Sequence, residues 1–171
     1  MSLDYEIHAA GAAPAAAAVP TLPRVDGIER RACSKALQWW RELAVPRHMP
    51  EFETVAAAPA GELQEFLFAI EVGEEPAANR FVMAGEVLKS ALGFDPTGKS
   101  MIEVWPRPAR ERACFLQKAT AELMNPIDEA GRWTNDDGDD VVYRCVLLPL
   151  SADQHRVDHL LGAFSFRTIR C

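Results

Sequence analysis

The chain has few residues of the kinds that build metal centres and disulfide frameworks. Among its 171 residues there are only four cysteines and four histidines. Cys33, Cys114, Cys145 and Cys171 are far apart, and none of them forms a Cys-x-x-Cys pair or has a histidine at metal-ligand spacing. We therefore expect neither a metal site nor a set of disulfide bonds.

Long apolar runs and excess positive charge are also missing. No apolar run approaches the roughly 18 residues that a membrane span needs, and the N-terminus carries Asp4 and Glu6 where a signal peptide has basic residues. These features predict a cytoplasmic protein with reduced thiols and no membrane contact. The net charge of −7 would repel a polyanion, so we expect no nucleic-acid partner.

Catalytic motifs are absent as well. The sequence contains no Gly-x-Ser-x-Gly elbow, no His-Glu-x-x-His pair and no dinucleotide fingerprint. We predict that the protein is not an enzyme, and we assign no catalytic residue.

One string, "GFDPTGKS" at residues 93–100, fits the phosphate-loop pattern of two glycines followed by Lys and Ser. Its context argues against nucleotide binding, because a phosphate loop follows a strand and opens a long helix. Here the string follows a helical pattern, and Pro96 has no N–H to donate. We interpret it as a turn between two helices, in which Gly93 ends the first helix and Gly98 allows the second helix to begin.

The order of elements follows from the periodicity of the apolar residues. Residues 1–27 are rich in Ala and Pro, which predicts a disordered tail. Residues 28–44 have one apolar half and one basic half, which predicts an amphipathic helix. Two strands (66–72 and 80–85) come next, and then a block of helices that ends with a long one at 109–124.

Three further strand patterns complete the chain, at residues 131–134, 141–150 and 157–169. The acidic string "NDDGDD" between the first two is typical of a hairpin turn, and its spacing does not match a calcium loop. A parallel sheet requires strands that alternate with helices, and here two strands are followed by a block of helices and then by three strands. The order favours an α+β fold with an antiparallel sheet.

Three strings carry a family resemblance. They are "WWRELAVPRHMP", "RFVMAGEVLKSALGFDPTGKSMIEV" and "YRCVLLPLSADQHRVDHLLGAFSF". Over residues 34–169 the chain resembles a bacterial family of small, stand-alone PAS-like proteins. The resemblance implies a PAS-like domain at residues 28–171, with a five-stranded antiparallel sheet, helices over one face and the N-terminal amphipathic helix outside. It also implies a non-catalytic sensory or regulatory protein in bacterial signalling.

The known PAS cofactors are not evident in the sequence. Around Cys114, "RACFLQ" lacks the Asn, Arg and Gly that accompany the cysteine of flavin photoreceptors, and residues 108–124 contain no histidine to ligate haem. The identity of any cofactor or ligand is therefore left unknown.

Two hypotheses on function remain open. In one, an unidentified small ligand binds between sheet and helices, against Trp105, Phe115, Tyr143 and Cys145. In the other, these side chains fill the core, and the protein is purely an interaction module. The helix at 28–44 would then mediate homodimerisation or docking to a signalling partner, because its apolar half is broader than one sheet face requires.

Overall fold

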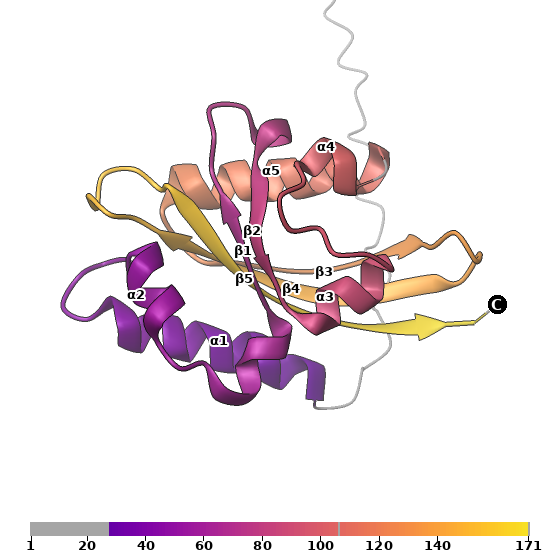
Figure 1. Ribbon diagram of the computed structural model, residues 1–171, viewed down its shortest axis with the longest axis horizontal. Helices are drawn as coiled ribbons and strands as arrows, with labels where there is room; N and C mark the ends of the chain where they lie inside the picture. The colour runs from indigo at the N-terminus through magenta and orange to yellow at the C-terminus, as the bar shows by residue number, and fades with distance from the viewer. Residues whose placement is uncertain (1–27, 106, 171) are drawn as a thin grey trace, which may run out of the picture.

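A computed structural model describes residues 28–105 and 107–170. At its centre lies an antiparallel sheet with the strand order β2-β1-β5-β4-β3 (Figure 1). The strands are β1 (Leu67–Glu71), β2 (Arg80–Ala84), β3 (Ile127–Thr134), β4 (Asp140–Leu150) and β5 (His159–Ile169). The predicted α+β fold with a five-stranded antiparallel sheet is confirmed. The predicted disordered tail at 1–27 lies outside the described residues.

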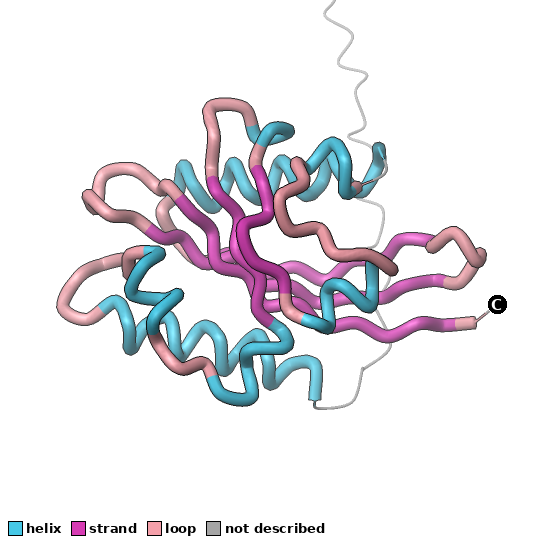
Figure 2. Tube along the Cα trace, viewed as in Figure 1, coloured by secondary structure: helices cyan, strands magenta, loops and turns pink. Residues whose placement is uncertain are grey.

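Helices lie on both sides of this sheet, with the strands between them (Figure 2). They are α1 (Ile28–Ala44), α2 (Phe52–Ala57), α3 (Glu86–Leu92), α4 (Met101–Val104) and α5 (Arg107–Leu123), with two 3₁₀ helices at Gly61–Phe66 and Pro76–Ala78. The sequence patterns did not predict α2 or the 3₁₀ helices, which are only three to six residues long and give a weak periodic signal.

The helix α1 covers the outer face of the sheet. Its buried side chains, Ala32, Ala36, Trp40 and Ala44, recur every four residues and form one stripe. The small alanines let the helix approach the strands closely, and the Trp40 indole N–H donates a hydrogen bond of 2.9 Å to the carbonyl of Pro149. The predicted amphipathic helix is therefore confirmed, and its buried stripe packs on the protein's own sheet.

The phosphate-loop-like string is a helix–turn–helix connection, as predicted. Gly93 has φ 78° and ends α3, where its N–H bonds to Lys89 O at 2.8 Å. Gly98 has φ 82°, and its N–H bonds to Phe81 O at 2.7 Å. Both glycines adopt the left-handed conformation that side chains with a Cβ disfavour. Ser100 then begins α4 in a capping box with Glu103.

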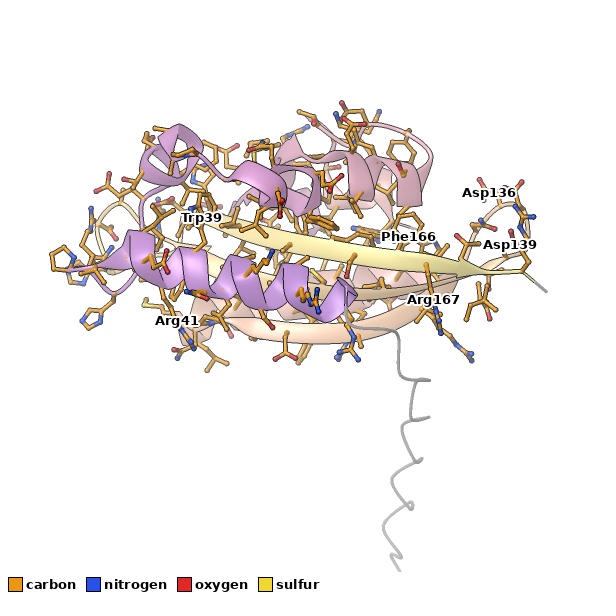
Figure 3. All side chains as sticks on the ribbon, turned by 90° about the horizontal axis from the view of Figure 1, so that it is seen from below. Trp39, Arg41, Asp136, Asp139, Phe166 and Arg167 are labelled. Atoms are coloured by element: carbon orange, nitrogen blue, oxygen red, sulfur yellow. The ribbon has the colours of Figure 1, made fainter. Side chains whose placement is uncertain are left out.

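The β3–β4 connection is a tight turn that extends beyond the helices, with Asp136 and Asp139 at its end (Figure 3). Gly138, at φ 83°, donates to Asn135 O at 3.0 Å, and Asn135 donates to Asp139 O at 2.9 Å. The predicted hairpin turn is confirmed. Within the described part of the chain, no group of three or more His, Cys, Asp or Glu side chains is arranged to hold a metal ion.

The loop after α1 is fastened to the loop between β4 and β5. The Gln154 side chain accepts hydrogen bonds from the backbone N–H groups of His48 and Met49, both at 3.0 Å, and donates one to Met49 O at 2.9 Å. Two strings that are about 105 residues apart and that carry the family resemblance therefore pack against each other. Of the helices in residues 28–105 and 107–170, none is long and apolar enough to span a membrane.

Candidate functional site: a cavity between the sheet and α5

A cavity of about 520 Å³ lies between the inner face of the sheet and the helices α3 and α5. Its volume falls within the range of about 300–1,000 Å³ that small-molecule pockets occupy. The lining is mainly apolar and includes Phe68, Ile70, Phe81, Leu88, Trp105, Ala113, Leu116, Trp133, Tyr143, Cys145, Leu147 and Phe164. The charged and amide residues of the lining are Arg112 and Gln117 of α5 and Glu129 and Arg132 of β3.

Aromatic rings form one wall of this cavity. Trp133 meets Trp105 edge-on, with ring centroids 5.4 Å apart, and lies 5.3 Å from Tyr143. Tyr143 in turn stacks on Phe164 at 5.5 Å. Side chains alternate between the two faces along each strand. Trp133, Tyr143 and Phe164 lie on the neighbouring strands β3, β4 and β5, and the register places all three on the inner face of the sheet. The wall is suited to a planar apolar group.

Two glycines make room for these rings. Gly131 lies opposite Tyr143 in the β3–β4 pair, and a Cβ there would approach the tyrosine hydroxyl oxygen to 2.5 Å. Gly162 lies opposite Phe68, where a Cβ would approach the ring to 2.0 Å. The absence of a side chain at both positions lets each ring lie flat across the neighbouring strand.

A few polar groups interrupt the apolar lining. The indole Nε1 of Trp105 is buried, and it has no hydrogen-bond partner among the described residues. Beside the cavity, Arg112 Nε lies 2.7 Å from Glu129 Oε1, and the Glu129 side chain is only 11% exposed. Burial raises the pKa values of the Tyr143 phenol and the Cys145 thiol. Both groups are therefore neutral at physiological pH, and Cys145 is not an activated nucleophile.

This architecture matches a known family. The family described as "PAS domain" matches residues 28–165. The chain belongs to the PAS domain family. PAS domains are sensory and regulatory signalling domains, and this chain is one of them.

Several solved PAS structures are similar to this PAS domain. The PAS domain of Bordetella pertussis BvgS is 14% identical, with a TM-score of 0.49 over 80% of this chain and 89% of that one. The Drosophila melanogaster Cycle PAS-B domain with bound ethylene glycol is 11% identical, with a TM-score of 0.46 over 60% of this chain and 99% of that one. A Rhodobacter sphaeroides LOV protein is 13% identical, with a TM-score of 0.46 over 60% of this chain and 58% of that one. Among curated proteins, none matches.

Three of the four residues predicted to form a pocket in this PAS domain line the cavity: Trp105, Tyr143 and Cys145. Phe115 does not, and that prediction is corrected. Its side chain is 62% exposed on the outer flank of α5, where the Arg112 guanidinium carbon lies 5.8 Å from its ring centroid. Cys114, the residue compared with the flavin-binding cysteine, does not line the cavity either.

Sequence reasoning missed the aromatic residues Phe68, Phe81, Trp133 and Phe164 as lining residues. A signal for Trp133 was present, since it is two residues from Gly131, which pairs with Tyr143. Once the register of the β3–β4 hairpin is known, the Trp133 and Tyr143 rings fall on the same face of the sheet. Without the register, the alternation pattern left open which face of β3 was the inner one.

The buried tyrosine makes the stability of this PAS domain pH-dependent. Desolvation raises the pKa of Tyr143 above its ordinary value of 10. As the pH rises past 10, the unfolded chain loses the phenol proton before the folded one does, so the folded state loses stability. We expect the wild type to lose about 1 kcal/mol more than Tyr143→Phe between about pH 9 and about pH 11. Urea unfolding of both proteins at each pH measures the difference, and equal losses would contradict the prediction.

Proposed function

We propose that this PAS domain is a non-catalytic sensor that binds a small, neutral, largely apolar molecule in the cavity, and that it acts in bacterial cytoplasmic signalling. The observation that carries the proposal is the buried Trp105 N–H beside an apolar cavity of about 520 Å³. A buried donor without a partner is costly. A ligand with a hydrogen-bond acceptor at this point would remove that cost, and its apolar part would cover the aromatic wall.

The charges beside the cavity support a neutral ligand. Arg112 and Glu129 pair with each other at 2.7 Å, so neither offers an uncompensated charge to a ligand. Arg132, the other charged residue of the lining, lies between Gly131 and Trp133 on β3, so its side chain points to the opposite face of the sheet, where it is exposed. The Tyr143 hydroxyl and the Cys145 thiol are both neutral. Tyr143 lines the cavity and has no hydrogen bond with another described residue, so its hydroxyl is a second candidate for anchoring the polar end of the ligand.

A signal from the cavity would leave through a surface of the domain. The earlier hypothesis assigns this surface to residues 28–44, as a homodimer contact or a docking site for a signalling protein. Leu37, Trp39 and Leu43 of α1 are only half buried, and Arg31, Lys35 and Arg41 are exposed. We keep a contact with an acidic partner at this basic surface as a proposal. The surface of α1 that remains for such a partner is narrow, because Ala32, Ala36, Trp40 and Ala44 already pack on the sheet.

Native mass spectrometry, compared with the denatured mass, tests the ligand proposal. We expect a retained non-covalent molecule on the wild type and at least about a tenfold lower occupancy on Trp105→Phe, which keeps an aromatic ring but removes the N–H donor. Phe115→Ala, outside the cavity, is the matched control and should keep the wild-type occupancy. Circular dichroism should show that both variants are folded.

A bare wild-type chain, or equal occupancy in Trp105→Phe, would count against this proposal. The bare chain would favour the alternative, an interaction module that works without a ligand.

A further inference from the structure

The two edge strands of the sheet differ in their protection. At one edge, β2 is covered by the α3–α4 connection, because Phe81 donates to Lys99 O at 3.0 Å and accepts from Gly98 N at 2.7 Å. At the other edge, the outer side of β3 receives no hydrogen bond from any described residue. An unpaired edge of this kind is a template for another strand.

The turn after β3 shows which backbone groups face this open edge. Asn135 N–H donates to Asp139 O across the hairpin, so Asn135 directs its backbone groups toward β4. Hydrogen-bonded and non-bonded positions alternate along an antiparallel pair. The odd-numbered residues of β3 therefore bond to β4. The N–H and C=O groups of Asp128, Ala130, Arg132 and Thr134 point outward.

The side chains along this edge are self-complementary. Asp128 and Arg132 are exposed, and neither has an ion-pair partner among the described residues. If a second copy of β3 pairs antiparallel about a two-fold axis at Ala130, Asp128 lies opposite Arg132 of the second copy, and the contact occurs twice. Both positions are hydrogen-bonded positions, as the ladder requires.

Neighbouring registers lack this match. With the axis moved by one residue, Asp128 would face Ala130 or Thr134. With the axis at Asp128 or at Arg132, like charges would face each other, which is unfavourable. Charge therefore selects one of the registers that the backbone allows.

We propose that two copies of this protein pair through the free edges of β3, so that their sheets join into one. On the inner face, Trp133 would lie opposite Ile127 of the second copy and add an apolar contact. Exposed Phe115 lies one helical turn from Arg112, which contacts Glu129 of β3, so an apolar ring flanks the same edge. Glu129, Gly131 and Trp133 line the cavity, so the same strand, β3, borders the cavity and forms the dimer contact.

Sedimentation velocity over a range of protein concentrations tests the pairing. We expect a monomer–dimer equilibrium for the wild type. Asp128→Arg and Arg132→Asp, each alone, should raise the dissociation constant at least about tenfold, because two ion pairs become two like-charge contacts. The double variant Asp128→Arg/Arg132→Asp should recover the wild-type constant, and an equimolar mixture of the two single variants should form a heterodimer.

Two further variants keep the test decisive. Ala130→Pro removes an outward N–H at an edge position that tolerates proline, and it should abolish dimers while the circular dichroism spectrum stays unchanged. Arg41→Asp lies on α1, away from the β3–β4 turn (Figure 3), and should leave the dissociation constant unchanged. A wild type that stays monomeric at every concentration would overturn the proposal. Failure of the double variant to recover dimers, or dissociation by Arg41→Asp alone, would do so as well. The dimerisation test needs no ligand in the cavity, so its failure and the failure of the proposed ligand binding are distinguishable.

Discussion

Replacement of Gly85 by alanine is expected to lower the free energy of unfolding by about 3 kcal/mol. Gly85 precedes α3, and a Cβ there would lie 2.4 Å from the carbonyl oxygen of Glu65 and 2.7 Å from that of Gln64. These are backbone atoms of the 3₁₀ helix at Gly61–Phe66, so no side-chain rotation relieves the contact. The Gly85 N–H also bonds to Leu67 O at 2.7 Å, which holds the two segments together. Urea unfolding followed by circular dichroism measures the change.

Gly73→Ala is the matched control for this substitution. A Cβ at Gly73 would meet nothing closer than 3.9 Å, and the residue is exposed. We expect a change within about 0.5 kcal/mol of zero. If Gly85→Ala unfolds at the same urea concentration as Gly73→Ala, the close contact between the 3₁₀ helix and α3 is not a constraint on the fold.

Replacement of Asn79 by alanine is the second large expected loss, at about 2–3 kcal/mol. Asn79 is only 2% exposed. Its Oδ1 accepts from Gly73 N–H at 2.9 Å, and its Nδ2 donates to Gln117 Oε1 at 2.8 Å. Gln117 is 3% exposed, so truncation leaves its buried oxygen without this partner. The same unfolding measurement applies.

The matched control for Asn79 is Asn125→Ala, since Asn125 is exposed and, among the described residues, its side chain bonds only locally, to Leu123 O. We expect that substitution to change stability by less than about 0.5 kcal/mol. A double variant, Asn79→Ala/Gln117→Leu, should be more stable than the sum of the single losses predicts, because it removes the orphaned acceptor as well. Strict additivity would show that the two side chains do not depend on each other.

The Asn79–Gln117 pair also connects the cavity to the rest of the domain. Gln117 lines the cavity from α5, and Asn79 lies beside β2 and accepts from Met101 N–H of α4 through its backbone carbonyl at 3.0 Å. A ligand that displaces α5 would therefore act on the β1–β2 connection as well as on β3. The Gln117–Asn79 contact lies beside β2, at the protected edge of the sheet, and the Arg112–Glu129 contact lies on β3, at the open edge.

Local patterns were sufficient to predict most elements. The apolar stripe of α1, the strand pattern of β4 and the two glycines at 93 and 98 each depend on residues close in the sequence, and the structure confirms all three. The prediction that the five strands form one antiparallel sheet came from the family resemblance. The pocket residues were only partly predictable. Tyr143 and Cys145 line the cavity as predicted, although alternation along a strand fixes which residues share a face and leaves open which face is inner.

The error at Phe115 has a physical cause. Phe115 and Leu116 are neighbours on α5, about 100° apart around the helix axis, and Leu116 is 7% exposed whereas Phe115 is 62% exposed. Both are strongly apolar, so hydrophobicity alone does not decide which one faces the sheet. Contacts from other elements decide it: Arg112 reaches Glu129 on β3, and Gln117 meets Asn79 on the opposite flank.

The sequence by itself determined the identity and order of most helices and strands, the turns that glycine and proline enforce, and the absence of known catalytic motifs. These properties depend on backbone conformation and on periodicity, which are local. The tertiary structure alone decided the strand register, the rotation of α5, the cavity with its unpaired Trp105 N–H, and the unprotected edge of β3. Each of these requires the relative position of segments far apart in the chain, where packing and hydrogen bonding act together.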